Sequence, residues 1–584
     1  MPEKPHNFWQ ELKRRKVIRV ITVYAASAFV ILELVDIVAP SLGLPAWTLN
    51  FVIVLLCVGF ILSITLSWVY DITPEGVKKT KSIDEVMKFE KKPTSNTWKV
   101  ISYISIFIII ILVVVNIISG KKRIEDISEL EKSIAVLPFD NMSLGEEFAH
   151  MGDAITDEII LELQKIKEFD RVLSRSSTMQ YKNDRPTIPE MAEKLGVNYL
   201  IEGSIQRHDE EVSIRVQVIR AKNEDHVWAD KYNRKWADIF SIQDEIALNV
   251  ANELKAVLAP EEVRQIEKQP TDNLEAYDLY LMGRYFWYQR REEDLLKSIN
   301  YFNRAIELDS NYALAYAGLA DAYFILPWYS DYPSNIAYTD AKKYAEIALS
   351  INKDIGEAHS TLGELALWND HNWELAEEEF KVAISINPQY DVAHQYYFEL
   401  LRILGRTEEA EEQINLALKY NPNFFIYLNQ RGKLYFEGGR YNEAIQEFTK
   451  VMEQRYYYNS ALYTLMCYLY LEKDKEAIDH IKDLIDNYYN SSNSNALLNE
   501  IYQTSGIEGI ISWFTDWLIK NRPQSYYEIS SFYGFLGNNT LALEYLEKYM
   551  ESNAEGKLFF INDPSFNNLK SEPRYLAIVR SMGL

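Results

Sequence analysis

The stretch "RGKLYFEGGRYNEAIQEFTKV", residues 431–451, decides the fold of the second half of this chain, because its pattern of small and large residues returns every 34 residues. The recurring columns are Ala376, Ala410 and Ala444; Phe380, Ile414 and Phe448; and Ala383, Ala417 and Val451. Each unit has apolar positions at helical spacing, a break, and a second helix that stops near a proline or its equivalent. A fixed period of this length predicts an array of stacked units, each formed by two helices.

These units resemble the tetratricopeptide repeat. Residues 431–451 supply the expected Gly432, Tyr435, Ala444 and Phe448, and the same pattern is present in "TLGELALWNDHNWELAEEEFKVAISINP", residues 361–388. The resemblance implies an all-α superhelix of about eight units over residues 271–560, followed by a capping tail over residues 561–584.

The resemblance also implies that the first helix of each unit lines an inner groove, which would bind a protein or peptide partner. The expected groove residues are Ser360, Glu364, Trp368, Gln395, Glu399, Arg402, Asn429, Lys433 and Phe436. Their mixture of acid, base and amide suits a peptide. They do not reproduce the paired Lys and Asn set with which some of these repeats clamp a C-terminal carboxylate.

Residues 131–262 predict a small α/β domain, because strand and helix patterns alternate before a hairpin. The first strand, "SIAVLPF", leads into a helix, but the loop between them holds one glycine, Gly145, no Lys and several acidic residues, so a phosphate loop is not favoured. We expect Asp153, Asp157 and Glu158 to lie near the start of this helix and to face water. A second strand is expected at "RVLSRSS", residues 171–177.

This domain resembles the one related to the amino-terminal part of the periplasmic protein TolB. The matching segments are Ile134 to Phe139, Gly152-Asp153, "LGVNYLIEGSIQ" at residues 195–206, and Trp228 with Tyr232. In membrane-anchored bacterial relatives, this domain and its repeats follow a cytoplasmic DNA-binding domain, as in CadC-like regulators, or a nucleotide cyclase domain, and are thought to act as an input or assembly module. We expect neither domain here, because about 16 residues precede the first apolar stretch and 27 separate the second from the third.

Residues 17–119 contain three apolar stretches, 17–38, 47–70 and 98–119, that predict a three-span membrane module behind a cytoplasmic tail of residues 1–16. The distribution of Lys and Arg predicts a multi-pass protein of the bacterial inner membrane, with residues 124–584 in the periplasm. The lipid bilayer is then one expected partner. Glu33 and Asp36 are the unusual acidic residues of the first stretch, and whether they are functional is left open.

Charge and composition exclude several functions. The net charge is −24, divided into +4 for residues 1–130 and −28 for the rest, so we expect no nucleic-acid partner. The two cysteines, Cys57 and Cys467, are 410 positions apart, which excludes a disulfide scaffold or a cysteine metal site. The eight histidines form no zinc motif, and no nucleophile elbow occurs, so no catalytic, metal-binding or cofactor-binding residue is expected.

The expected fold therefore consists of three transmembrane helices, a small α/β domain and a tetratricopeptide repeat superhelix. The expected function is that of a non-catalytic scaffold, which binds a protein or peptide of the cell envelope in its groove. The alternative is a sensory module that signals across the membrane to a separate effector. The partner's identity, the pathway, a ligand of the α/β domain and a homo-oligomeric state stay open.

Overall fold

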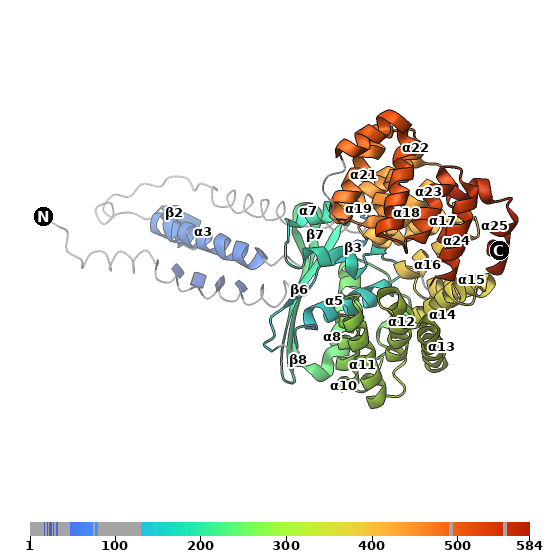
Figure 1. The fold of residues 1–584 in the computed structure, drawn as a ribbon. Helices are drawn as coiled ribbons and strands as arrows, with labels where there is room; N and C mark the ends of the chain where they lie inside the picture. Colours follow the sequence, from blue (N-terminus) through green and yellow to red (C-terminus); the bar gives the residue numbers. More distant parts are fainter. Residues whose placement is uncertain are drawn as a thin grey trace. The chain divides into compact units, whose positions relative to one another are not determined.

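The computed structural model describes residues 47–73, 76–79, 130–145, 148–489, 495–552 and 557–584, together with single positions between 17 and 35. The chain divides into two compact units, Met1–Glu125 and Asp126–Leu584 (Figure 1).

The first unit contains helix α3 (Trp47–Val69) and a short antiparallel hairpin of β1 (Tyr70–Thr73) and β2 (Gly76–Lys79). The phenol of Tyr24 donates a hydrogen bond to the carbonyl oxygen of Leu56 at 2.8 Å, and its ring lies against Phe60.

The structure of this unit contradicts the predicted membrane module. Within the described residues, no helix has both the length and the apolar character needed to cross a bilayer. The three transmembrane helices, the bilayer as a partner and the multi-pass inner-membrane location with a periplasmic body are therefore wrong for the described part. The third predicted span, Glu33, Asp36 and residues 1–16 lie outside the described residues.

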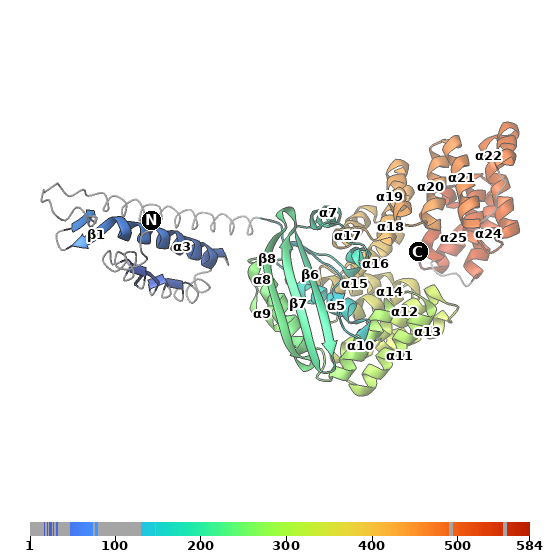
Figure 2. The same cartoon turned by 90° about the vertical axis from the view of Figure 1, so that its left-hand side faces the viewer.

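The second half of the larger unit, called the solenoid below, is built from stacked helices (Figures 1 and 2). They pair as α10 (Leu274–Trp287) with α11 (Glu292–Leu308), α12 (Ala313–Tyr329) with α13 (Ser334–Ile351), α14 (Gly356–Trp368) with α15 (Trp373–Ile386), α16 (Asp391–Ile403) with α17 (Thr407–Tyr420), α18 (Phe425–Glu437) with α19 (Tyr441–Gln454), α20 (Tyr458–Tyr470) with α21 (Asp474–Tyr489), and α23 (Tyr526–Phe535) with α24 (Asn539–Glu551). Helix α22 (Asn495–Asn521) is interrupted at Gly506, which has a φ of 64°.

The recurring small and large residues pack as the repeat pattern predicts. Ala376 and Phe380 are fully buried between neighbouring helices, and the ring of Phe380 lies against the backbone of Gly363. A Cβ added to Gly363 would lie 2.6 Å from that ring, so the close approach of α14 and α15 requires glycine there. Gly432 has the same relation to Phe448 in the pair α18 and α19.

The C-terminal segment, residues 557–584, follows the last helix pair. It forms two short 3-10 helices, η6 (Lys557–Phe560) and η7 (Pro564–Leu569), and the helix α25 (Pro573–Ser581). Figure 1 shows α25 and the C-terminus beside α24 and close to α15, and the indole N–H of Trp373 on α15 donates to the carbonyl oxygen of Gly583 at 3.1 Å.

The α/β domain contains a mixed sheet. Its strands are β3 (Ser133–Val136), β4 (Asp140–Asn141), β5 (Arg171–Val172), β6 (Tyr199–His208), β7 (Glu211–Arg220) and β8 (Asp225–Lys235). The order is β5-β3-β6-β7-β8, and β4 also pairs with β6; β3 is parallel to both neighbours, whereas β6, β7 and β8 are antiparallel. The expected second strand ends at Val172, because residues 175–178 form the short helix α6 (Arg175–Thr178) instead.

Helices cover the two faces of this sheet unequally. Helices α5 (Met151–Gln164) and α8 (Ile239–Glu253) pack on one face, against Ile201, Ile214 and Val218, and α9 (Pro260–Ile266) follows α8. On the other face, α7 (Ile188–Leu195) covers only the part around Leu137 and Leu200. The remainder of that face, along β6, β7 and β8, stays uncovered within the larger unit (Figure 2). The side chains on this part of the face are mostly polar.

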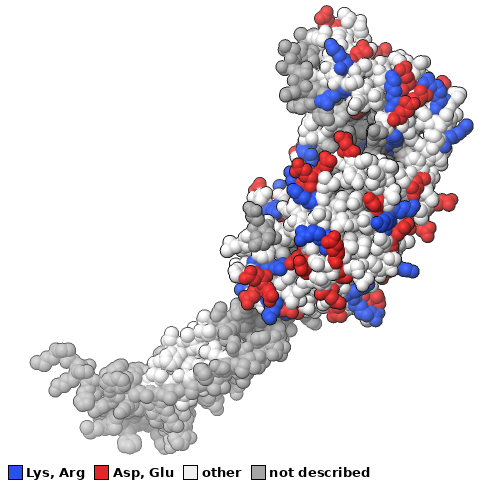
Figure 3. Space-filling model, turned by 60° about the horizontal axis from the view of Figure 1, so that its bottom comes forward, with Lys and Arg blue, Asp and Glu red and all other residues white. Residues whose placement is uncertain are grey.

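Acidic and basic side chains are interspersed over the face of the larger unit in Figure 3, with uncharged areas between them.

Candidate functional site

The nine predicted groove residues lie on the first helices of three consecutive pairs, α14, α16 and α18. Eight of them are buried, with exposed fractions from 0% for Phe436 to 8% for Gln395 and Asn429, whereas Trp368 is half-buried. The structure therefore brings these side chains into one region, but most of them contact other parts of the chain. Their role in partner binding stays a prediction.

Buried charges of this region form a network of their own. The guanidinium of Arg402, which is 1% exposed, contacts Glu399 at 2.9 Å and Glu437 at 2.8 Å. Burial, followed by the charge of Arg402, lowers the pKa of Lys433 to about 8. Arg402 pairs with Glu399 and Glu437, and the side chains of all four residues are buried, so they are poorly placed to contact a partner directly.

The C-terminal segment lies against these groove residues. The ammonium of Lys433 is 4.0 Å from the ring centre of Phe559, and the ring of Trp368 meets Phe559 edge to face at 5.7 Å. The side-chain amide of Asn562 donates to the carbonyl oxygen of Arg402 at 2.5 Å. This part of the solenoid thus holds a peptide segment by an aromatic side chain and a backbone contact.

The rest of the segment is anchored in the core. Leu558, Phe560, Phe566 and Leu569 are at most 1% exposed. Burial of each such side chain contributes about 1.5–3 kcal/mol, so release of all four opposes displacement by on the order of 10 kcal/mol. The segment is therefore an integral part of the folded solenoid. Because a partner would not displace it, the partner must bind beside it.

An aromatic surface remains accessible beside the segment. We call it the aromatic rim; it consists of Trp328, Tyr329, Trp368 and Phe559. The ring of Trp328 meets that of Trp368 at 5.6 Å, Trp368 meets Phe559, and Tyr329 is 43% exposed. Large, partly exposed aromatic side chains are the residues that dominate binding energy at protein interfaces.

We expected the acidic residues at the start of α5 to face water, but they are buried. Asp153, Asp157 and Glu158 are 4%, 5% and 8% exposed. Asp153 pairs with Arg175 at 3.2 Å and with Lys182 at 2.7 Å. Their burial was missed because it depends on segments later in the chain: Arg175 and Lys182 contact Asp153, and α10 of the solenoid contacts Asp157.

One of these acids, Asp157, forms hydrogen bonds between the α/β domain and the solenoid. Asp157 accepts hydrogen bonds from Arg284 at 3.1 Å and from the phenol of Tyr288 at 2.9 Å, both on or next to α10. The guanidinium of Arg175 lies 4.1 Å from the ring centre of Tyr288. Glu158 lies beside this network, and burial, followed by the charge of Asp157, raises its pKa to about 8.

A second contact joins the edge of the sheet to the connection between α15 and α16 of the solenoid. The side chain of Gln389 accepts from the N–H of Val172 at 2.7 Å and donates to the carbonyl oxygen of Phe169 at 3.2 Å. Asp391 accepts from the hydroxyl of Ser174 at 2.8 Å. The α/β domain and the solenoid are therefore built as one body.

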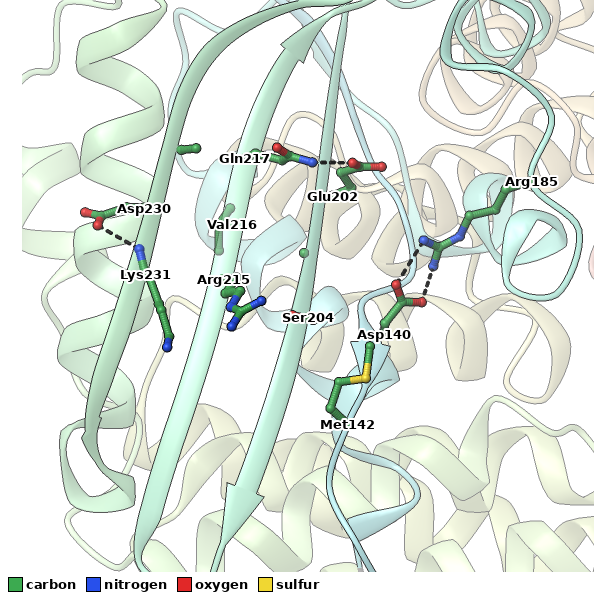
Figure 4. Close-up of a pocket in the computed structure, with 12 residues that line it drawn as sticks. Asp140, Met142, Arg185, Glu202, Ser204, Arg215, Val216, Gln217, Asp230 and Lys231 are labelled. Carbon is green, nitrogen blue, oxygen red and sulfur yellow. Dashed lines mark hydrogen bonds and ion pairs between the residues drawn. The ribbon is translucent and has the colours of Figure 1, made fainter. Parts of the chain in front are cut away.

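The uncovered sheet face contains a trough of about 610 Å³ (Figure 4). Its lining residues are Asp140, Met142, Arg185, Glu202, Gly203, Ser204, Arg215, Val216, Gln217, Ala229, Asp230 and Lys231. On one side, Arg185 pairs with Asp140 at 2.8 Å and donates to the carbonyl oxygen of Pro138 at 2.7 Å. On the sheet itself, the amide of Gln217 donates to Glu202. Sequence reasoning did not identify this trough, because which part of a sheet face a helix leaves open depends on tertiary packing.

In the part of the chain that the structure describes, no group of three or more His, Cys, Asp or Glu side chains is arranged to hold a metal ion. The buried thiol of Cys467 lies in an apolar environment, and its burial raises its pKa.

Comparison with protein families assigns two parts of the chain. Residues 130–248 match the family described as the second domain of HilA/YgeH-like transcriptional regulators, and residues 426–458 and 523–555 match the tetratricopeptide repeat. The expected repeats are confirmed by this match. The resemblance of the α/β domain to TolB stays a prediction.

One curated relative is the putative adenylate cyclase 3 of Rhizobium meliloti (strain 1021), which is 34% identical over 239 residues. The match covers 40% of this chain and 40% of the relative, so the chain spans about two fifths of that protein. This agrees with the expectation that cyclase-fused relatives share part of this chain.

Solved structures that are similar to the solenoid include PilW, a type IV pilus biogenesis factor, and PilF of Pseudomonas aeruginosa. PilW is 16% identical, with a TM-score of 0.33, covering 39% of this chain and 99% of that one. PilF is 15% identical, with a TM-score of 0.31, covering 37% and 93%. YrrB, a tetratricopeptide repeat protein with an unusual peptide-binding site, is 20% identical, with a TM-score of 0.23, covering 32% and 88%.

Proposed function

We propose that this chain is a non-catalytic scaffold, which binds a protein or peptide partner at the aromatic rim of its solenoid. The observation that carries the proposal is the contact of Phe559 with Trp368 and Lys433. Trp368 and Lys433 already bind an aromatic side chain of a peptide segment, so the chemistry of this surface suits a further segment of the same kind.

The rim also has the composition of a binding surface. Tyrosine and tryptophan offer large contact areas at a small entropic cost, because few of their bonds rotate. Tyr329 is the most exposed of the four residues and follows Trp328 on α12, and Trp328, Trp368 and Phe559 are half-buried. We therefore expect a partner to place apolar or aromatic side chains against these rings.

The proposal is tested by photo-crosslinking of the full chain in its native cells. A photoreactive phenylalanine analogue replaces Tyr329 in one variant and Tyr301, on the outer helix α11, in a matched control. We expect a defined adduct from position 329, none from position 301, and loss of the adduct when Trp368→Ala is added. Equal adducts from both positions, or an adduct that survives Trp368→Ala, would refute binding at the rim.

A regulatory input role is the second candidate function. Two matches favour it: the α/β domain matches a domain of transcriptional regulators, and the relative that shares two fifths of its length is named a putative cyclase. The identity of the crosslinked protein separates the two functions. A cyclase or a DNA-binding protein in the adduct supports the input role, whereas another class of protein supports the scaffold.

A further inference from the structure

The trough on the sheet face contains two basic side chains, Arg215 and Lys231, that form no ion pair among the described residues, although Glu202 and Asp230 also line it. Arg215 on β7 and Lys231 on β8 lie directly opposite each other in the register of the two strands. Both side chains are exposed on the face shown in Figure 4. Like charges at directly opposed positions destabilise a sheet, so the pair weakens the fold in the absence of a counter-charge.

Other basic side chains of this sheet and of the trough do form ion pairs. Arg185, the third basic residue of the trough, pairs with Asp140 at 2.8 Å. On the opposite, helix-covered face of the sheet, Arg207 pairs with Asp278 at 2.9 Å and Arg234 with Glu245 at 2.7 Å. Among the described residues, neither Arg215 nor Lys231 has a carboxylate within ion-pair distance. Because residues 131–584 carry a net charge of −28, the absence of an acidic partner at this pair is not explained by a shortage of carboxylates.

We propose that the trough binds a small phosphorylated ligand, whose phosphate group lies between Arg215 and Lys231. The charges match, because a phosphate monoester carries about −1.5 to −2 near neutral pH, whereas a single carboxylate would neutralise only one of the two cations. Ser204 lies opposite Arg215 on β6 and supplies a hydroxyl donor on the same face.

The trough is larger than a phosphate group. Its volume of about 610 Å³ falls within the roughly 300–1,000 Å³ of small-molecule sites. Glu202 and Gln217 lie next to the charged pair and offer acceptors and donors for hydroxyl groups, and Met142 offers an apolar contact at the opposite wall. The ligand is therefore a phosphorylated small molecule with polar groups beyond the phosphate. This inference is independent of partner binding by the solenoid.

The test measures thermal unfolding of the full chain at constant ionic strength, with inorganic phosphate, ribose 5-phosphate or acetate in place of chloride. Four proteins are compared: the wild type, Arg215→Gln, Lys231→Gln, and the control Lys222→Gln, which removes an exposed lysine outside the trough. In chloride, we expect Arg215→Gln and Lys231→Gln to unfold at the same temperature as the wild type or higher, because each relieves the repulsion.

Both phosphate compounds should raise the unfolding temperature of the wild type and of Lys222→Gln, with ribose 5-phosphate acting at lower concentration, and acetate should have no effect. The affinity derived from this shift should fall about tenfold or more in Arg215→Gln and in Lys231→Gln. An equal phosphate response in all four proteins would identify an adventitious ion only and refute the site. No response of the wild type to either phosphate compound, or a response to acetate as strong as that to phosphate, would also refute it.

Discussion

The side chain of Gln389 completes the edge of the sheet, because it accepts a hydrogen bond from the N–H of Val172 at 2.7 Å, 217 positions earlier in the chain. The same amide donates to the carbonyl oxygen of Phe169 at 3.2 Å. A residue of a solenoid turn thus takes the place of a neighbouring strand, and Val172 is fully buried beneath it.

Replacement of Gln389 by alanine should therefore destabilise the whole larger unit. Both backbone groups lose their partner in a buried site, which costs about 2–4 kcal/mol of the free energy of unfolding. Urea unfolding followed by fluorescence measures the loss. The matched control is Gln446→Ala at an exposed position of α19, which should change the free energy by less than about 0.5 kcal/mol. Equal values for the two variants would contradict a structural role of Gln389.

Much of the solenoid follows from sequence because its contacts are local and periodic. Ala376 and Phe380 were identified from their spacing, and both are fully buried as that spacing requires. The sequence pattern also predicts the α/β domain, apart from the strand at residues 171–177, which ends at Val172 and is followed by α6.

What could not be foreseen depends on distant parts of the chain. The periodicity of α16 and α18 places Arg402 and Lys433 on the inner side, but nothing in it shows that Phe559 covers them. Likewise, the sequence around Asp157 predicts a solvent-exposed residue in the first turns of a helix. Its partner Arg284 is 127 positions away, so local sequence does not indicate that Asp157 is buried. The trough depends on where α7 stops covering the sheet, which the spacing of residues in β6 and β7 does not reveal.

Gly363 should tolerate no side chain. A Cβ at this position would lie 2.6 Å from the ring of Phe380, and overpacking of this kind costs about 1–3 kcal/mol. Gly363→Ala should lower the free energy of unfolding by that amount, and Phe380→Leu in the same chain should recover part of it by clearing the space.

Gly438 serves as the control for this prediction. It ends α18 with a φ of −82°, and a Cβ there would meet its nearest atom at 3.5 Å. Gly438→Ala should leave stability unchanged or raise it by up to about 1 kcal/mol. If Gly363→Ala were as harmless as Gly438→Ala, the close approach of α14 and α15 would be wrong.

Glu158 should make the stability of the chain depend on pH. Burial, followed by the charge of Asp157, raises its pKa from 4.5 to about 8. The folded chain therefore keeps a proton that the unfolded chain has lost, so the stability contributed by this group is fully present below pH 4.5 and is lost as the pH rises through about 8. Glu158→Gln should match the wild type in acid and become the more stable protein as the pH rises.

Urea unfolding of both proteins at a pH of about 4.5 and of about 9 measures this difference. Glu193→Gln, at an exposed position of α7, provides the control and should follow the wild type at both values. A difference between Glu158→Gln and the wild type that does not grow with pH would show that Glu158 is ionised in the folded chain.

Phe559 should protect Lys433 from water and from reagents. Its ring lies 4.0 Å from the ammonium, and the lysine is 6% exposed, with a pKa lowered to about 8, first by burial and then by the charge of Arg402. Phe559→Ala removes a half-buried ring but leaves Leu558 and Phe560 in the core, so the fold should lose about 1–3 kcal/mol through the lost burial and the lost cation–π contact. Acetylation of the full chain near pH 8, read by mass spectrometry, should then modify Lys433 faster in the variant, while the exposed Lys450 on α19 reacts equally in both proteins.

An unchanged rate at Lys433 would mean that the C-terminal segment does not cover this lysine in solution. The partner site would then extend from the aromatic rim into the groove itself.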